Sequence, residues 1–269
     1  MPARLRRQVL DAPATRIPEL VSLGHTSQNG AAALGLGRHR HDGAWELCWF
    51  ARGSADWWAD GTVHGLAAGW CYLTRPGVEH GSLTGLLEAC DLHWLQLTPP
   101  TDPALAAALA RAPLAFPAPR LGPLWADLWS ELARRDPLAG LATRAALHRL
   151  LAAALTAPRQ RPSPAIARAL ARADEGRASV AALARAAGLS TCVLHERFHA
   201  ELGDSPAAWL RRERLREAKR RLWRTDEAVT AIAHACGFAT SQRFATAFRE
   251  STGLPPQAWR ERARTFDAG

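Results

Sequence analysis

Two stretches of the chain repeat each other: residues 180–209 read VAALARAAGLSTCVLHERFHAELGDSPAAW, and residues 229–259 read VTAIAHACGFATSQRFATAFRESTGLPPQAW. The first part of each repeat matches at a fixed offset, and the second part matches after a one-residue insertion. The paired positions are Val180 with Val229, Leu183 with Ile232, Ala184 with Ala233, Gly188 with Gly237, Leu194 with Phe244, Phe198 with Phe248, Gly203 with Gly253, Pro206 with Pro256 and Trp209 with Trp259. Such a repeat indicates two copies of one helical unit.

Each repeat begins with an Ala-rich amphipathic helix, predicted over Val180–Ala187 and Val229–Cys236, that runs into a glycine. Gly188 and Gly237 stand where a helix end favours left-handed backbone, which glycine adopts without strain at Cβ. A second helix would follow, with its N-terminus capped by a hydroxyl side chain. The candidate caps are Ser190 in the first repeat and Thr240 or Ser241 in the second. This order of elements is the layout of a helix-turn-helix unit.

The second helix of each repeat has one apolar and one polar face. The side chains predicted to pack inward are Leu194, Phe198 and Leu202 in the first repeat and Phe244 and Phe248 in the second. The side chains predicted to point outward are Cys192, His195, Glu196 and His199, then Gln242, Arg243, Thr246 and Arg249. Gln pairs with adenine, Arg with guanine, and Glu accepts from cytosine, so the outward sets are candidates for reading bases. The alternative is that both faces are only solvated.

The segment between the repeats, Trp209–Trp223, has the pattern of one amphipathic helix rich in arginine. Held rigid, it would place the two second helices in successive major-groove segments, about 34 Å apart. Its exposed arginines, including Arg211, would lie near phosphates and add affinity without sequence information. The alternative is an ordinary solvated charge run, partly neutralised by Glu213 and Glu217.

Three motifs in this half carry a family resemblance. They read Arg214-Leu-x-x-Ala218-x-x-x-Leu222, Ala231-Ile-Ala-x-x-x-Gly237-Phe238, and Phe244-x-x-x-Phe248-x-x-x-x-Gly253-x-x-Pro256. Residues 165–262 thereby resemble the C-terminal signature of the AraC transcription regulators. The resemblance implies two helix-turn-helix subdomains joined by a long helix, which bind promoter DNA and most often activate transcription together with RNA polymerase. By position in the family motif, the base-reading residues would be Cys192, His195 and Glu196, then Gln242, Arg243 and Thr246.

The N-terminal part has a different character. Short apolar runs broken by turn residues predict strands of a barrel or sandwich, at Trp45–Ala51, Trp70–Leu73 and Leu92–Leu97. Helices are predicted at Asp102–Ala110, Leu121–Arg135 and Leu138–Ala157. A proline-rich linker over residues 158–164 would separate an N-terminal domain, residues 1–157, from a C-terminal domain, residues 165–269. The predicted fold class is α+β: a cupin-like β-barrel with a helical segment, followed by an all-α DNA-binding domain.

The N-terminal histidines resemble the two motifs of the cupin barrel. The motifs read His39-x-His41-x-x-x-x-Glu46 followed by Gly53, and Gly69 followed by Pro76-Gly77-x-x-His80. This resemblance implies that His39, His41, Glu46 and His80 can converge on a divalent metal, for which imidazole and carboxylate are suitable ligands. The alternative is an organic effector in the barrel. For that pocket we expect Trp45, Trp49 and Trp58 to form apolar walls, with His39 and His80 as polar groups.

Two apolar stripes mark the predicted N-terminal helices. They consist of Leu124, Leu128 and Leu132, then Leu147, Leu150 and Leu151. By analogy with the family, the stripes could pair two subunits into a homodimer; packing against the barrel explains them equally well.

Composition limits the class of protein further. The 269 residues carry a formal net charge of +9. Most of the excess lies in residues 165–269, which hold 18 Arg and Lys against 12 Asp and Glu, and this favours a polyanionic partner. No apolar run approaches the roughly 20 residues of a membrane span, and no secretory signal is evident, so we expect a cytoplasmic protein. We expect a regulator and not an enzyme; the alternative is a metal-dependent cupin oxygenase or isomerase with a nucleic-acid-binding appendage.

Overall fold

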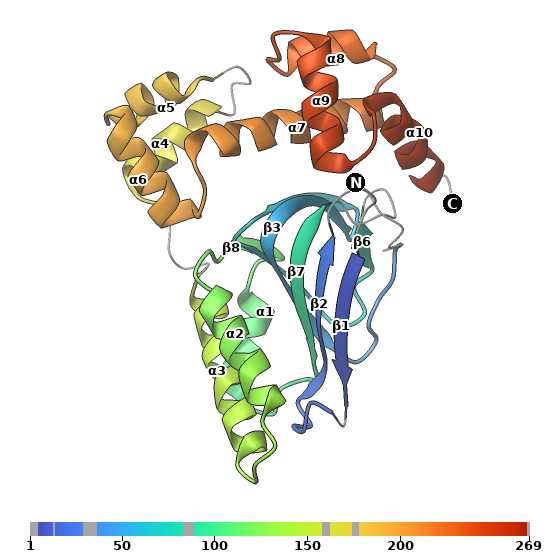
Figure 1. Cartoon of the computed structure of the whole chain (residues 1–269), viewed down its shortest axis with the longest axis vertical. Coiled ribbons are helices and arrows are strands. Elements are labelled where there is room, and N and C mark those ends of the chain that lie inside the picture. The colour runs from blue at the N-terminus through green and yellow to red at the C-terminus, as the bar shows by residue number, and fades with distance from the viewer. Residues whose placement is uncertain are drawn as a thin grey trace.

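The computed structural model describes residues 5–12, 14–28, 37–82, 89–157, 162–173 and 178–267. Its N-terminal part is an eight-stranded antiparallel sheet in the order β1-β2-β7-β3-β5-β8, with β4 and β6 pairing to β3 (Figure 1). The strands are β1 (Leu5–Asp11), β2 (Leu20–Gln28), β3 (Trp45–Ala59), β4 (Thr62–Ala67), β5 (Trp70–Thr74), β6 (His80–Ser82), β7 (Cys90–Leu97) and β8 (Ala115–Pro117). The three predicted apolar runs all lie in strands, whereas β1 and β2 were not predicted.

The two faces of the sheet pack against different cores. On the inner face, β3 buries Cys48 and Phe50 before its irregularity and Ala55 and Trp57 after it. On the outer face, Leu47 and Trp49 join a core that includes leucines of the following helices. The register of β3 against β7 shifts between Phe50 and Arg52. Alternate residues of a strand point to opposite faces, so this extra residue exchanges the faces that even- and odd-numbered positions occupy.

Three helices come after β7 in the chain, with β8 between the first and the second, and they cover the outer face of the sheet (Figure 1). They are α1 (Pro103–Arg111), α2 (Gly122–Ala133) and α3 (Ala139–Thr156). All three agree closely with the predicted helices. The leucine stripes of α2 and α3 are buried in the outer core, and Leu128, Leu147 and Leu150 are fully inaccessible. The stripes therefore pack on the sheet, which was one of the two alternatives.

The C-terminal part is helical and contains both repeats. Its helices are α4 (Pro164–Ala173), α5 (Val180–Ala187), α6 (Thr191–Leu202), α7 (Pro206–Arg224), α8 (Val229–Ala235), α9 (Ser241–Thr252) and α10 (Pro256–Asp267). Gly188 and Gly237 follow α5 and α8 with φ of 69° and 78°, the left-handed geometry that the repeat predicts. Ser190 accepts from the Val193 amide and Thr240 from the Arg243 amide, so each second helix has its hydroxyl cap. Of the predicted linker, residues 158–161 lie outside the described part.

Helix α7 joins the two repeats and also contacts the sheet (Figure 1). Its Lys219 forms an ion pair with Asp56 on β3, with 2.9 Å between Nζ and Oδ2. Both side chains are buried.

A separate finding concerns membranes: no helix in the described ranges is both long and apolar enough to cross a bilayer.

Candidate nucleic-acid interface and sensor sites

Helix α6 presents its polar face to solvent. Leu194 and Phe198 are completely buried in the core of the first repeat, which fixes the rotation of the helix. The candidates on the opposite face are all exposed: Cys192, His195, Glu196 and His199. The Cys192 thiol lies 4.0 Å from Glu196 Oε1. One exposed face of α6 therefore carries every residue that was predicted to read bases from the first repeat.

Helix α9 repeats this arrangement with different chemistry. Phe244 and Phe248 are completely buried, and their rings contact each other with centroids 5.3 Å apart. The predicted outward side chains are exposed: Gln242, Arg243, Thr246 and Arg249. Gln and Arg side chains can each make two hydrogen bonds to one base edge, so α9 offers the more conventional chemistry for reading DNA.

The arginines of α7 are mostly paired with nearby carboxylates. Arg216 pairs with Glu213, and Arg220 and Arg221 pair with Glu217. Exposed pairs of this kind contribute little to stability. Arg211 is exposed and ion-paired with Glu250 on α9. It also borders a cleft with Gly53 and Ser54 of β3, so this arginine lies close to the sheet.

Inside the barrel, four predicted side chains come together. The ligand atoms of His39, His41, Glu46 and His80 all lie within 4.8 Å of one another. Glu46 Oε2 is 3.0 Å from His80 Nε2, and Glu46 Oε1 is 3.4 Å from His41 Nε2. Burial acts to raise the pKa of Glu46, but hydrogen bonds with His41 and His80 outweigh it and hold the pKa at about 2. The Glu46 carboxylate is therefore ionised at neutral pH.

Backbone carbonyls orient two of these imidazoles. His80 Nδ1 is 2.9 Å from the Val78 carbonyl, and His39 Nδ1 is 2.8 Å from the Gly37 carbonyl. A carbonyl only accepts, so each Nδ1 donates its proton. In His39 the neutral ring then carries its lone pair on Nε2, whereas His80 Nε2 faces the ionised Glu46 carboxylate, which also accepts, so this contact requires either a second proton on the ring or a metal ion between the two groups. Burial lowers the pKa of His39, which favours that neutral form. This donor set and these tautomers fit a divalent transition-metal ion, because ligating histidines usually donate their other N–H to a carbonyl or carboxylate.

The predicted tryptophan walls need a correction. Trp45 and Trp49 lie on the outer face of the sheet, where the Trp49 indole donates to the Ala118 carbonyl at 3.0 Å. Trp58 also points away from the inner core and stacks under the Arg38 guanidinium, 4.3 Å from its ring centroid. The residue inside is Trp57, whose ring centroid is 6.1 Å from that of His80. Strand alternation from the inward-facing Glu46 places Trp45 and Trp49 outside, and the irregularity after Phe50 exchanges Trp57 for Trp58.

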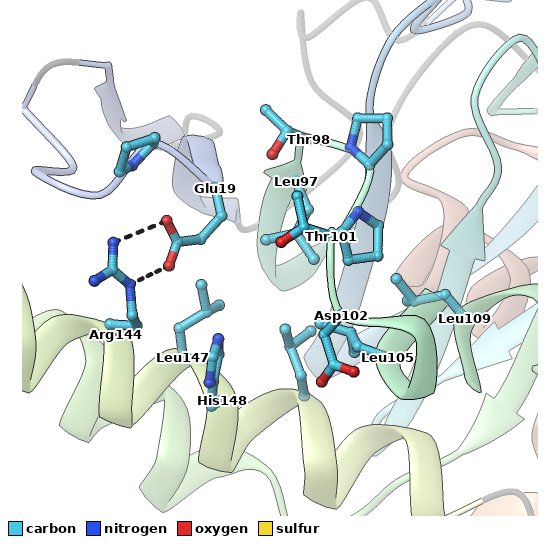
Figure 2. Close-up of a pocket in the computed structure, with 14 residues that line it drawn as sticks. Glu19, Leu97, Thr98, Thr101, Asp102, Leu105, Leu109, Arg144, Leu147 and His148 are labelled. Carbon is cyan, nitrogen blue, oxygen red and sulfur yellow. Dashed lines mark hydrogen bonds and ion pairs between the residues drawn. The ribbon is translucent and has the colours of Figure 1, made fainter. Parts of the chain in front are cut away.

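A cavity of about 390 Å³ opens between the end of β7, the turn into α1 and helix α3 (Figure 2). Its floor is apolar, with Leu97, Leu109 and Leu147. At its mouth Arg144 pairs with Glu19, and this hydrogen bond lowers the pKa of the Glu19 carboxyl (Figure 2). No sequence motif marked this cavity, because its lining comes from three segments far apart in the chain.

Another histidine cluster lies on the outer face of the sheet. His25 on β2 and His93 on β7 are register partners, and their rings stack with centroids 4.3 Å apart. His25 Nε2 contacts the Asp91 carboxylate, and the Trp129 indole donates to His93 Nδ1. Burial lowers the pKa of His93 to about 4, so this ring is neutral at physiological pH. The indole occupies the lone pair at Nδ1, and therefore the neutral ring carries its proton on Nε2. This tautomer is the reverse of that of His39, and it leaves His93 no free lone pair for a metal ion.

Known protein families match both halves of the chain. The model of the AraC-like ligand binding domain matches residues 27–182, and the model of a helix-turn-helix domain matches residues 183–262. The activator RhaS of Pectobacterium carotovorum is 43% identical over 70 residues, which are 26% of this chain and 25% of RhaS. The activator NphR of a Rhodococcus species is 37% identical over 79 residues, or 29% of this chain and 23% of NphR. The chain thus spans about a quarter of the length of these relatives.

Among solved structures, the DNA-binding domain of the transcriptional factor AdpA, in complex with a target DNA, is 29% identical. The match covers 38% of this chain and 96% of that domain, with a TM-score of 0.37. A sheet-built ligand-binding domain joined to two helix-turn-helix units defines a DNA-binding transcription regulator. The ligand-binding model alone matches more than half of the 269 residues, and the chain belongs to the AraC family.

Proposed function

We propose that this regulator reads a two-part operator with the exposed faces of α6 and α9. The observation that carries the proposal is that each of these helices has one buried apolar face and one exposed polar face. Leu194 and Phe198 on α6, and Phe244 and Phe248 on α9, are fully buried, and every predicted contact residue on the opposite faces is exposed. A helix held by its apolar face can enter a major groove with its polar face. Arg243 and Gln242 would read bases, whereas Arg211 would contact phosphate.

A selection of bound sequences from random DNA tests this proposal with the full chain. We expect an enriched site with two conserved segments about one helical turn apart. Arg243→Ala should lose the preference in one segment and keep it in the other. Arg172→Ala is a suitable control, since this residue lies on α4 and belongs to neither predicted reading face. Enrichment of a single segment, unchanged by Arg243→Ala, would contradict the assignment of α9.

For the sensor, we infer that the barrel cluster holds a divalent transition-metal ion next to the effector site. Support comes from two imidazoles whose Nδ1 atoms are held by backbone carbonyls, which leaves Nε2 of each ring as the nitrogen able to bind a metal, and from a buried carboxylate that stays ionised. His39, His41, Glu46 and His80 would be the ligands. The bound ion would supply positive charge that an anionic or carbonyl group of an effector can approach.

Metal content tests this inference directly. After treatment with a chelator, the full chain should rebind one equivalent of Zn²⁺, measured by equilibrium dialysis and elemental analysis. His80→Gln should lower the affinity strongly, whereas His148→Gln, in the cavity between β7, α1 and α3, should not. Equal zinc binding by wild type and the His80 variant would refute the metal site and leave these histidines as walls of an effector pocket.

Further partners are proposed from the family. The regulator would act in the cytoplasm on promoter DNA, contact RNA polymerase, respond to a small-molecule effector and work as a homodimer. Leu138, just before α3, and Leu141, on α3, are large apolar side chains that remain exposed and would suit the pairing of two subunits. We propose that the chain is not an enzyme. Consumption of a substrate by the metal-loaded protein would overturn that point, and light scattering would measure the oligomeric state.

A further inference from the structure

We propose that the β3–β4 hairpin of the sensor couples the barrel interior to the DNA-binding half. The buried ion pair of Asp56 and Lys219 fixes the hairpin against α7, and we call this pair the lock. The inference rests on the proposed sensor function of the barrel, but its test requires neither an effector nor an operator. The sequence contains 33 arginines and one lysine, and that lysine is the side chain buried against the sheet.

The contact between hairpin and helix is closely packed. Lys219 is 4% exposed and Asp56 is 8% exposed, so the pair is shielded from water. Gly65 on β4 is the register partner of Asp56. A Cβ at this glycine would lie 2.5 Å from Cδ of Arg216, so the arginine side chain of α7 rests directly on the β4 backbone. Val63, on the same strand, packs against the core of the second repeat.

The opposite face of the same hairpin looks into the barrel. Trp57 follows Asp56 on β3, and its register partner on β4 is His64. The Trp57 ring lies 5.5 Å from that of Tyr72 and 6.1 Å from that of His80, measured between centroids. Neighbouring residues on one strand therefore face the metal-ligand cluster and α7 respectively. Because packed interiors do not deform continuously, a shift of Trp57 or His80 must move the strand that holds Asp56.

Helix α7 passes such a shift to both reading helices. Its Leu210 lies in the core of the first repeat, and its Leu215, Ala218 and Leu222 lie in the core of the second. The contact with the sensor leaves the predicted base-reading side chains of α6 and α9 exposed. The hairpin therefore sets the position of α7 and does not cover the reading faces.

The single lysine makes the contact measurable. An amine-reactive reagent applied to the full chain, with peptide mass spectrometry, reports the labelling rate of Lys219 alone. In the wild type we expect labelling at least tenfold slower than in the urea-unfolded chain. Asp56→Asn should raise the rate about tenfold or more, because it removes the carboxylate that pairs with the buried ammonium. Glu217→Gln is the matched control: it breaks the pairs with Arg220 and Arg221 on α7 and should leave the rate unchanged.

A second pair of variants tests the coupling itself. Trp57→Leu changes the inner wall beside His80 and should raise Lys219 labelling several-fold. Trp94→Leu changes an inner-face tryptophan on β7 and should not. Thermal melts must show that each variant is folded. Wild-type labelling as fast as in urea, or no increase in Asp56→Asn, would overturn the lock. Equal rates in Trp57→Leu and wild type would overturn the coupling, whereas failure to bind zinc or DNA would reject only the proposed function.

Discussion

At the scale of single residues, the faces of β3 decide which side chains can serve the sensor. The strand carries four tryptophans within fourteen residues, and sequence spacing alone does not distinguish them. Alternation from Glu46 would place every even-numbered position inside, including Trp58. The register irregularity after Phe50 reverses this, so Trp57 lies inside and Asp56 outside. One extra residue in a strand thus provides both the inner wall and the contact with α7.

The base-reading assignment is testable at Arg243. Arg243→Ala should cost about 1 to 3 kcal/mol of binding free energy at the selected site if the guanidinium contacts a guanine. Preference at that base should relax, and binding to random DNA should change little. Fluorescence anisotropy with matched and mutated duplexes measures both effects. An equal loss on all sequences would reveal a phosphate contact instead.

The turn of the second repeat depends on Gly237. With φ at 78°, any residue with a Cβ is strained there, and Gly237→Ala should destabilise the folded state by about 1 kcal/mol or more. The matched control is Gly43→Ala, where an added Cβ meets no heavy atom within 4 Å and φ is not positive. Denaturant unfolding compares the two variants. Equal stability would mean that the turn can relax around the side chain.

At the scale of elements, each helix-turn-helix unit is specified by local sequence signals, and the same signals occur in both repeats. Each has a Ser or Thr cap, a left-handed glycine and an aromatic or aliphatic pair at helical spacing. These signals act within a few residues, and the predicted helices therefore agree with those of the structure. The strands β1 (LRRQVLD) and β2 (LVSLGHTSQ) lacked such signals because neither contains an unbroken apolar run, although β2 also pairs with the distant β7.

Packing of α9 can be separated from its DNA contacts. Phe248→Ala removes a fully buried ring and should cost about 3 to 5 kcal/mol of unfolding free energy. Thr246→Ala, two residues away on the exposed face, should leave the unfolding free energy nearly unchanged and affect only DNA binding. Circular dichroism melts and anisotropy titrations distinguish the two. A strong stability loss in Thr246→Ala would place that side chain inside a core.

Contact of α7 with DNA phosphates can be recognised from the salt dependence of binding. Arg211→Ala should weaken cognate and random DNA alike and reduce the salt slope of binding by about one. Arg216, which lies over Gly65 and pairs with Glu213, should show no such effect when changed to alanine. If Arg211→Ala leaves the salt slope unchanged, its pairing with Glu250 is its role and α7 does not approach the phosphates.

At the scale of the whole molecule, sensor and reader meet through one hairpin and one helix. The pairing of Asp56 with Lys219 spans 163 positions of the chain as numbered, so no local pattern predicts it. The same is true of the cavity between β7, α1 and α3. Such sites arise only when distant segments are folded against each other.

Metal binding should be visible in the stability of the whole chain. Zinc at a hundred times its dissociation constant should stabilise the folded state by about 2.7 kcal/mol, because it binds the folded state preferentially. The melting temperature should rise with zinc and fall again with a chelator. His80→Gln should show no rise, whereas His195→Gln on the exposed face of α6 should behave as the wild type. A zinc effect that survives in His80→Gln would place the binding site elsewhere.

Spacing and motifs were enough to predict the two helix-turn-helix units, their caps and turns, the division of α6 and α9 into two faces, and the set of histidines and glutamate that converge in the barrel. These features depend on spacing within one element or on motifs of adjacent strands. Only the tertiary structure decided which tryptophan faces the barrel, that the leucine stripes cover the sheet, and that the single lysine is buried against β3. The physical reason is that strand irregularities and contacts between distant segments are set by packing, which no local periodicity records.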